Sequence, residues 1–259
     1  MRRHIVALLI LILLGQSLSN LNSNNYDIDS LNDDLTAKST QKSNATLSLT
    51  DIDSPNIIDI FAGGYNSCFI NSQNEFYCWG YDYYGNIVTG TSQNGDTPFP
   101  TSIVGFPGAI FQYSTSISHA CALSVPAMTT TNALYCWGSS INGALGNGHS
   151  GSANFRPTLV DLGIGRYATE VSVGHRHSCA LLDNGYVSCW GNGNSGTLGN
   201  GQSGVWNSPV NVSIIPNGLT VRNISAGVYH TCAIMSDFSV FCWGKQSYTA
   251  SHSGERYFF

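Results

Sequence analysis

A three-residue marker, Cys-Trp-Gly, recurs four times in this chain and constrains its fold more than any other feature. The copies begin at residues 78, 136, 189 and 242, so they lie 58, 53 and 53 residues apart. A second cysteine precedes each marker by ten to fifteen residues. A fixed period of about 50 residues with local insertions is typical of propeller blades and other repeat arrays. The sequence therefore predicts an array of four similar units.

The third unit shows what each repeat is built from. Residues 177–182 and 186–191 read as two short strands around a turn of Asp-Asn-Gly. If residues 183–185 form a three-residue loop, Leu181 faces Val187 and the two cysteines of the unit lie directly opposite one another. The same spacing recurs in the first and fourth units, while the second has a longer turn. We therefore expect four cross-strand disulfides, which join Cys68 to Cys78, Cys121 to Cys136, Cys179 to Cys189 and Cys232 to Cys242.

The first 19 residues have the pattern of a secretory signal peptide. Arg2, Arg3 and His4 precede an unbroken apolar run from residue 5 to residue 14, and small residues follow before Asn20. A run of ten is about half of what a bilayer-spanning helix needs, although an uncleaved signal anchor stays open as the alternative. We expect residues 1–19 to be removed on export, which leaves no stable membrane span. The mature protein is then secreted or displayed at the cell surface, where disulfides persist.

Residues 20–54 differ in composition from the repeats. They are rich in Asn, Ser, Asp and Thr, and Tyr26 is their single aromatic residue. Such a segment cannot bury enough apolar surface to offset the entropy of ordering it, so we interpret it as a flexible polar spacer. In an alternative interpretation, residues 45–51 add one strand to the first unit. The repeat array then spans residues 55–259, with the last unit incomplete.

Composition favours strands and argues against a nucleic-acid partner. Charged residues make up 10% of the chain, glycine occurs 28 times, and the aromatic fraction is 11%, as expected for strands and tight turns. The net charge is −5, and the basic residues of the repeats are widely spaced. Binding to a phosphate backbone requires clustered cations. We therefore expect an all-β protein that does not bind nucleic acid.

The repeat resembles that of a known family. His-Ser-Cys-Ala-Leu at 177–181, Cys-Trp-Gly at 189–191 and Gly-Thr-Leu-Gly-Asn-Gly at 196–201 are similar to the repeat of the regulator of chromosome condensation family. The similarity extends over residues 57–246, but the first unit has Asn66 in place of the histidine, and the fourth lacks the glycine stretch.

The family resemblance implies a seven-bladed β-propeller with four-stranded blades. Four units would form only an incomplete part of such a ring. The chain would then be a truncated relative, or it would close by forming a homo-oligomer; a complete four-bladed propeller is the third alternative.

Histidines and tryptophans of the repeat have competing interpretations. His119, His177 and His230 each lie two residues before a cysteine, a spacing that could place metal ligands on one face of a strand. Each unit offers only three ligands, however, and the first unit lacks the histidine, so we expect no metal site. The resemblance implies instead that the histidines hydrogen-bond to the backbone within or between blades.

The four marker tryptophans are expected to pack between blades, because they recur once in every unit. Trp79, Trp137, Trp190 and Trp243 are these residues. Trp206 lies outside the pattern in a predicted loop, so we expect it at the surface.

Nothing in the sequence predicts catalysis. No serine lies in a Gly-x-Ser-x-Gly elbow, and the acidic residues of the repeats are scattered. We therefore predict no enzyme, no catalytic residue, no cofactor and no metal.

The function that the sequence favours is binding outside the cell. Tyr81, Tyr83, Tyr84 and Trp206 are the aromatic residues that we expect on exposed loops, where they would contact another protein or a surface glycan. One alternative is guanine-nucleotide exchange on a small GTPase, the activity for which the resembling family is named. A second alternative is an accessory domain of a truncated exported enzyme.

Overall fold

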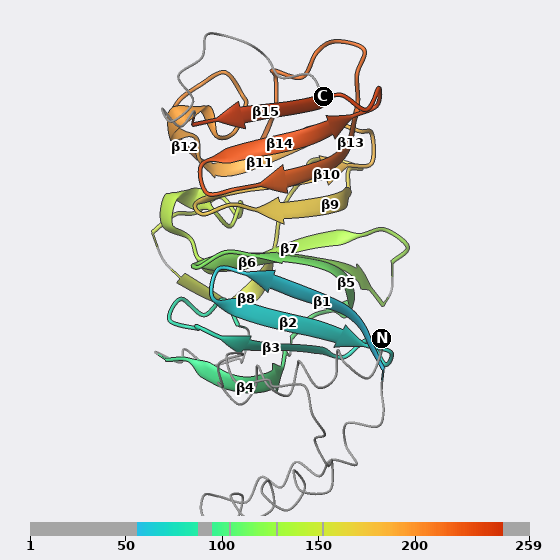
Figure 1. The fold of residues 1–259 in the computed structure, drawn as a ribbon, viewed down its shortest axis with the longest axis vertical. Helices are drawn as coiled ribbons and strands as arrows, with labels where there is room; N and C mark the ends of the chain where they lie inside the picture. Colours follow the sequence, from blue (N-terminus) through green and yellow to red (C-terminus); the bar gives the residue numbers. More distant parts are fainter. Residues whose placement is uncertain (1–55, 88–94, 104, 128, 152, 246–259) are drawn as a thin grey trace, which may run out of the picture. The chain divides into compact units, whose positions relative to one another are not determined.

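Four antiparallel sheets follow one another along the chain in the computed structural model (Figure 1). The structure describes residues 56–245 except 88–94, 104, 128 and 152. Each sheet is one blade, and within these residues the only helical elements are two single 3-10 turns, η3 (Ile141–Gly143) and η4 (Asn194–Gly196). The prediction of an all-β, propeller-like array of about four blades is confirmed.

The first three blades have four strands each, and the last has three among the described residues. Blade 1 consists of β1 (Ile57–Gly63), β2 (Asn66–Asn71), β3 (Phe76–Gly80) and β4 (Thr97–Ser102). Blade 2 consists of β5 (Gly108–Thr115), β6 (His119–Pro126), β7 (Ala133–Ser139) and β8 (Ala153–Leu159). Blade 3 consists of β9 (Ala168–Val173), β10 (His177–Leu182), β11 (Val187–Asn192) and β12 (Val205–Asn211). Blade 4 consists of β13 (Val221–Ala226), β14 (His230–Met235) and β15 (Val240–Gly244).

The central hairpin of each blade has the register that cysteine spacing predicts. In blade 3, Leu181 pairs with Val187. The amide of Gly185 donates to the carbonyl of Leu182 at 2.9 Å, and Gly185 has φ +78°, so residues 183–185 form the expected three-residue loop. The register is confirmed in all four hairpins, where the paired cysteines lie opposite one another.

All four predicted disulfides form between paired residues of a central hairpin. They join Cys68 to Cys78, Cys121 to Cys136, Cys179 to Cys189 and Cys232 to Cys242, and their Cα atoms are 4.0–4.1 Å apart. Six of these cysteines are at most 1% exposed. In blade 4, by contrast, Cys232 is half-buried and Cys242 is exposed. The last disulfide is therefore the accessible one.

The core lies between blades rather than within them. Three apolar clusters occupy the three seams, and each joins residues of two consecutive blades. In the seam between blades 2 and 3, for example, Leu123 and Leu145 of blade 2 share a cluster with Val171 and Trp190 of blade 3. Each blade therefore needs a neighbour to bury its apolar face, as in other repeat arrays.

The marker tryptophans anchor each blade on the one before it. The indole N–H groups of Trp137, Trp190 and Trp243 each donate to a backbone carbonyl of the preceding blade, at 2.9–3.0 Å. The expectation of inter-blade packing is confirmed for these three buried residues. It is wrong for Trp79, which is only half-buried, because no described residue forms a blade in front of blade 1.

Several predictions concern segments before and after the four sheets. The signal peptide at 1–19, the spacer at 20–54 with its alternative strand at 45–51, and the tail after residue 245 lie outside the described residues. Within the described residues, no helix has the length and apolar character that a membrane crossing requires.

Candidate functional site

Two of the three repeat histidines, His119 and His177, lie in the seams between blades. The Nε2 atom of His119 lies 2.9 Å from the Ser178 hydroxyl of the next blade, and Nε2 of His177 lies 2.9 Å from the Thr231 hydroxyl. The contacts run between blades as expected. His119 also has the expected hydrogen bond with the backbone of the next blade, at His177, and the side-chain hydroxyls are further partners that the sequence did not predict.

Burial keeps these two histidines neutral. Desolvation, followed by the effect of neighbouring histidines, lowers the pKa of His119 to about 3 and that of His177 to about 4. A neutral imidazole can donate from one nitrogen and accept at the other, which suits a hydroxyl-rich seam. The histidines therefore act as structural groups at neutral pH.

The cysteine sulfurs next to these histidines are not available as metal ligands, because all eight are oxidised in disulfides. Among the residues that the structure describes, no group of three or more His, Cys, Asp or Glu side chains converges on one point. The described part of the chain therefore presents no metal-binding cluster of that kind.

A cluster of four tyrosines at one end of blade 1 is the candidate binding site. Tyr65 and Tyr83 are 66% and 56% exposed, and Tyr81 and Tyr84 are half-buried. The ring centroids of Tyr65 and Tyr81 are 5.9 Å apart, and those of Tyr83 and Tyr84 are 5.2 Å apart. Tyr81 also contacts Tyr83 at 6.2 Å and Tyr84 at 6.3 Å. The four rings therefore form one continuous aromatic surface, which we call the tyrosine cluster.

Two separate segments of the sequence build the tyrosine cluster. Tyr65 lies in the turn between β1 and β2, and the other three follow β3. The amide of Tyr81 donates to the carbonyl of Tyr65 at 3.1 Å, which fixes one segment against the other. The preceding Gly64 has φ +58°, and a Cβ atom there would lie 2.6 Å from the backbone of Ser116 and Ile117. The turn that presents Tyr65 therefore depends on glycine.

A buried carboxylate holds the loop of the tyrosine cluster in place. Asp82 is 0% exposed, and its Oδ1 accepts a hydrogen bond from the amide of Ile87 at 2.8 Å. The amide of Gly85 donates to the Asp82 carbonyl at 3.1 Å. Burial raises the pKa of Asp82 to about 6, while the Ile87 amide lowers it. Tyr83 and Tyr84 lie inside this closed loop, so hydrogen bonds on both sides restrain their backbone.

The protonation of the cluster suits hydrogen bonding. Desolvation raises the pKa of Tyr81, and its neighbours Tyr84, Tyr83, Asp96 and Tyr65 raise it further. The Tyr81 hydroxyl therefore stays protonated at neutral pH and can both donate and accept.

Sequence reasoning identified three members of this cluster and missed Tyr65. Tyr65 immediately precedes Asn66, the residue that replaces the histidine of the other units, and Tyr229 has the same place before His230. In every blade, the residue at this place accepts a hydrogen bond from the amide that follows the marker. Aligning the units on their markers would therefore have placed Tyr65 beside Tyr81.

The expectation for Trp206 is corrected by the structure. Trp206 lies in β12, not in a loop, and it is half-buried against the core of the seam between blades 3 and 4. A Cβ atom at Gly193 would lie 2.7 Å from its ring. Trp206 therefore packs over the glycine-rich loop of its own blade.

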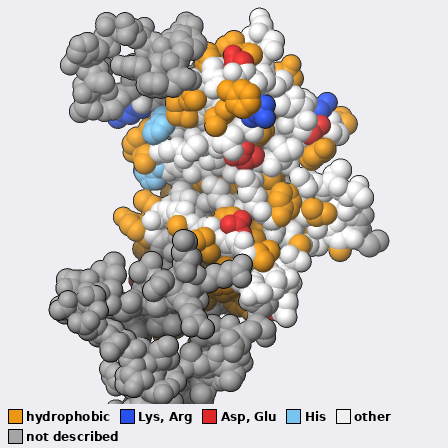
Figure 2. Space-filling model, turned by 45° about the vertical axis from the view of Figure 1, so that its right-hand side comes forward, with side chains coloured by type: hydrophobic (Ala, Val, Ile, Leu, Met, Phe, Trp, Pro, Cys, Tyr) orange, Lys and Arg blue, Asp and Glu red, His pale blue; other side chains and the backbone are white. Residues whose placement is uncertain are grey.

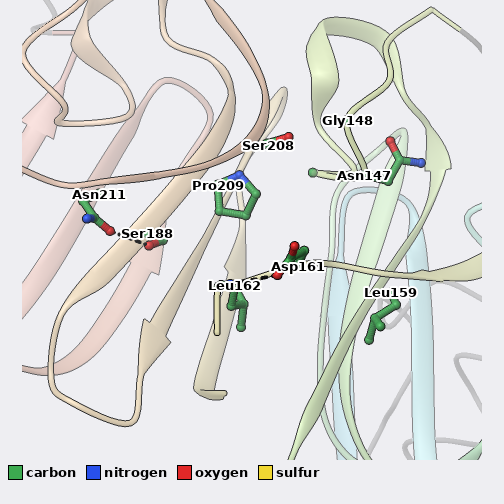
Figure 3. Close-up of a pocket in the computed structure, with 11 residues that line it drawn as sticks. Asn147, Gly148, Leu159, Asp161, Leu162, Ser188, Ser208, Pro209 and Asn211 are labelled. Atoms are coloured by element: carbon green, nitrogen blue, oxygen red, sulfur yellow. Dashed lines mark hydrogen bonds between the residues drawn. The ribbon is translucent and has the colours of Figure 1, made fainter. Parts of the chain in front are cut away.

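A shallow pocket of about 480 Å³ lies between blades 2 and 3 (Figure 3). Its lining combines one carboxylate, two amide side chains and two hydroxyls, contributed by Asp161, Asn147, Asn211, Ser208 and Ser188. One Asp161 oxygen accepts from the amide of Gly163 at 2.9 Å. Ser188 donates to the amide oxygen of Asn211 at 3.1 Å. The pocket can hydrogen-bond a small polar group, but no histidine or second carboxylate accompanies Asp161, so it offers no acid–base pair.

The charged side chains of the described residues are spread over the surface seen in Figure 2. On the face shown in Figure 2, acidic and basic side chains are scattered and form no extended patch of one sign. A phosphate backbone would need a continuous basic surface. This face of the described residues provides none.

Two models of the regulator of chromosome condensation (RCC1) repeat match the sequence. One matches residues 132–181 and 184–234, and the other matches residues 57–86, 168–197 and 221–249. Together these matches cover more than half of the chain. The chain belongs to the RCC1 repeat family. The matches of the second model begin at the first strand of blades 1, 3 and 4, whereas each match of the first model runs from the last two strands of one blade into the first two strands of the next.

Similar curated proteins share this repeat over most of the chain. The human E3 ubiquitin-protein ligase HERC2 is 28% identical over 193 residues, which are 74% of this chain and 4% of HERC2. The ultraviolet-B receptor UVR8 of Arabidopsis thaliana is 27% identical over 187 residues, which are 72% of this chain and 40% of UVR8. The chain thus spans less than half the length of these RCC1-repeat relatives.

Solved structures agree on the fold. Human WBSCR16 superposes with a TM-score of 0.61 at 22% identity, over 73% of this chain and 48% of that protein. Yeast RCC1 (Prp20) superposes with a TM-score of 0.60 at 17% identity, over 77% of this chain and 45% of that protein. These two structures agree with the propeller-type fold of the four blades.

Proposed function

We propose that this protein is a non-catalytic binding module that works outside the cell and recognises another protein through the tyrosine cluster. The observation that carries the proposal is the exposure of Tyr65 and Tyr83 on a loop that Asp82 holds rigid. Large aromatic side chains with few rotatable bonds lose little entropy on binding, and they dominate the energetics of protein interfaces.

The behaviour of similar folds supports a protein partner. The yeast protein Prp20p binds Gsp1p and histones, and it is also known in complex with Kap60. These partners are those of Prp20p, and they support for this chain only the proposal that a fold of this kind can bind a protein surface. The described residues bring together no nucleophile, base and orienting acid, so the tyrosine cluster has no catalytic group beside it.

Work outside the cell is supported by the cysteine chemistry. Four disulfides that each cross a short hairpin are stable in an oxidising compartment and are reduced in the cytosol. The apolar run at residues 5–14 provides the matching export signal.

The first test is partner capture with the exported protein. Affinities are then compared between two variants that replace exposed tyrosines. Partners captured by the wild type are identified, and their affinity is then measured for Y65S/Y83S and for Y186S. Tyr186 is 56% exposed, as Tyr83 is, but it lies on the turn of blade 3. We expect Y65S/Y83S to weaken binding by about 30-fold, which corresponds to a hot-spot loss of about 2 kcal/mol. Equal affinity of the two variants would sink the proposal.

The alternatives have different thiol chemistry and different mass. A nucleotide exchange factor for a small GTPase would work in a reducing compartment, so its eight cysteines would alkylate without prior reduction. An accessory domain of a larger exported enzyme would have an intact mass far above that of residues 20–259. Eight alkylated cysteines only after reduction, on a chain of that mass, support the binding module.

A surface glycan is the second candidate ligand, and the pocket of Figure 3 favours it. Asp161, Asn147 and Ser208 offer the acceptors and donors that sugar hydroxyls need. Binding to a glycan array that D161A abolishes and Y65S/Y83S leaves unchanged would assign the glycan to this pocket.

A further inference from the structure

Two asparagines of the described residues lie in the acceptor pattern for N-linked glycans, which is Asn, then any residue except proline, then Ser or Thr. The patterns are Asn211-Val212-Ser213 and Asn223-Ile224-Ser225. A third copy, Asn44-Ala45-Thr46, lies outside the described residues. A glycan is bulky and polar, so a modified asparagine has to lie at the surface of the folded, exported protein. The surroundings of Asn211 and Asn223 therefore decide which of them can carry one.

Asn211 is exposed at the end of β12, the edge strand of the blade 3 sheet. Its Oδ1 accepts a hydrogen bond from the Ser188 hydroxyl at 3.1 Å, which orients the amide group (Figure 3). Its Nδ2, the atom to which a sugar is attached, has no hydrogen-bond partner among the described residues. The side chain also lines the pocket between blades 2 and 3, so there is space beside it. A sugar at Asn211 would therefore break no contact of the fold.

Asn223 is also exposed, but its side chain is engaged with a neighbouring blade. It lies in β13, and its Nδ2 donates to Oε1 of Glu170 in blade 3 at 2.9 Å. The amide of Ile224 donates to the other oxygen of Glu170 at 3.2 Å, so one half-buried carboxylate joins blades 3 and 4. A sugar on Nδ2 of Asn223 would crowd this carboxylate and disturb the seam. The fold therefore favours Asn211 over Asn223 as the acceptor.

Apolar side chains near Asn211 give a glycan at this place a use in solubility. Leu159 lines the same pocket and is 57% exposed, and Ile214, three residues after Asn211, is 42% exposed. β12 is also an edge strand, which can pair with another chain unless it is shielded. A polar sugar chain at Asn211 would cover apolar surface and keep a second molecule away from this strand.

We propose that Asn211 carries an N-linked glycan in the exported protein and that Asn223 does not. The inference rests on export, which is part of the proposed function. The donor is an oligosaccharide linked through a diphosphate to a membrane lipid. The bond from the sugar C1 to the diphosphate oxygen breaks, the bond from C1 to Nδ2 forms, Nδ2 loses one proton, and the lipid diphosphate leaves. The glycan stands at the rim of the pocket in Figure 3 and limits access to it, while the tyrosine cluster on blade 1 stays accessible.

The test produces the full chain, with its own N-terminal residues, in a eukaryotic secretory host and collects it from the medium. Its intact mass is measured before and after treatment with peptide N-glycosidase F, an enzyme that releases the glycan and converts the modified asparagine to aspartate. Treatment in water enriched in heavy oxygen labels that residue, and peptide mapping identifies it. We expect the label at residue 211 and none at residue 223.

S213A and S225A are the matched variants, because each removes one acceptor pattern and leaves its asparagine in place. Ser213 and Ser225 are both exposed, so neither change should unfold the protein, and circular dichroism reports whether both variants fold. We expect S213A to lose the mass of one glycan and S225A to lose none. Residue 44 serves as an internal control, because a label there shows that the host glycosylates this chain.

Several outcomes would overturn the proposal. An exported chain without a glycan at residue 211 removes this site and leaves the proposed binding function untouched. An unchanged mass of S213A assigns the glycan to another residue, and a label at residue 223 removes the distinction between the two seams and surfaces. A chain that stays inside the cell removes the glycan and export together. The affinity of Y65S/Y83S for a captured partner is a separate measurement, so the two proposals can fail independently.

Discussion

The seam between blades 2 and 3 contains a hydrogen-bonded pair of a histidine and a hydroxyl, which the seam between blades 1 and 2 lacks. The seam between blades 1 and 2 relies instead on Asn86, whose carbonyl accepts from Trp137 and whose side chain donates to carbonyls of blade 2. In the seam between blades 2 and 3, the Ser178 hydroxyl donates to the carbonyl of Ala144 at 3.0 Å, and Trp190 donates to the same carbonyl at 2.9 Å. Because Ser178 uses its proton there, it accepts from Nε2 of His119, which fixes the tautomer of that histidine.

The seam between blades 1 and 2 has Asn66 in the histidine position and Ala120 in the hydroxyl position. Both polar side-chain atoms of Asn66 are buried without a hydrogen-bond partner in the described residues. Aromatic packing takes over, with the rings of Phe61 and Phe76 lying 5.7 and 5.0 Å from that of Tyr113. The histidine and the hydroxyl therefore act as a pair across two blades, and the seam between blades 1 and 2 lacks both.

Substitution of a seam tryptophan should have the largest effect. W190A removes a fully buried ring and the indole hydrogen bond, so we expect the free energy of unfolding to fall by about 4 kcal/mol. W79A removes a half-buried ring with no seam in front of it, and the loss should stay below about 1 kcal/mol. Urea unfolding measures both values, and similar losses would contradict the assignment of the core to the seams.

Acidification should have the second largest effect, because it weakens the seams that contain His119 and His177. The folded pKa values of His119 and His177 are about 3 and about 4, below the unfolded value of 6.5. The unfolded state therefore binds more protons as the pH falls below 6.5, and stability declines on acidification. Between pH 7.5 and pH 5 we expect a loss on the order of 2 kcal/mol for each histidine.

The double variant H119N/S178A gives the seam between blades 2 and 3 the residues of the seam between blades 1 and 2. Its stability should fall less steeply with pH by about 1 kcal/mol per unit between pH 6 and pH 5. The effect of Asp82 on the pH dependence of stability has the opposite sign. Its pKa is raised to about 6 in the folded state, so the folded state binds more protons than the unfolded state and gains stability as the pH falls below 6. A pH slope that is unchanged in the double variant would remove His119 from the explanation.

The exposure of the sulfur atoms should set the order in which the disulfides are reduced, and this effect should be smaller than the effects on stability. A thiolate reductant must reach a sulfur atom, and Cys242 is exposed while Cys179 and Cys189 are 0% exposed. We expect the disulfide between Cys232 and Cys242 to be reduced at least about tenfold faster than the one in blade 3. Brief treatment with dithiothreitol, alkylation and peptide mapping measure the order, and simultaneous reduction of all four would show that the blades open together.

Restoring the missing pair should have the smallest effect and sharpen the comparison most. N66H/A120S places a histidine opposite a hydroxyl in the seam between blades 1 and 2. We expect the double variant to gain about 1 kcal/mol, and each single variant to be neutral or less stable, because one partner alone leaves a buried polar group unpaired. A double-mutant cycle of urea midpoints gives the coupling energy, which should be close to zero if the seam of blade 1 cannot accept the pair.

The pairing within one blade and the packing of the marker tryptophans between blades could be predicted from the sequence, but the partners of the inter-blade hydrogen bonds could not. The pairing of Cys179 with Cys189 follows from ten residues of spacing and a turn rich in polar residues and glycine. The partner of His119 lies 59 residues away, and nothing local marks Ser178 as different from Ala120. Trp206 was expected in a loop because it lies outside the repeat pattern. Packing on Gly193, not local propensity, decides its position.

Blade 3 carries both halves of the inter-blade chemistry in one unit. Its Ser178 and Trp190 face blade 2, and its His177 and the Thr197 carbonyl face blade 4. A duplicate of this blade placed after itself would therefore meet a histidine with a hydroxyl and a tryptophan with a carbonyl. Blade 1 cannot serve in this way, because Asn66 offers no histidine and Phe69 replaces the alanine found at Ala180. In engineering terms, blade 3 is a building block from which longer arrays can be assembled, and blade 1 is suited only to begin one.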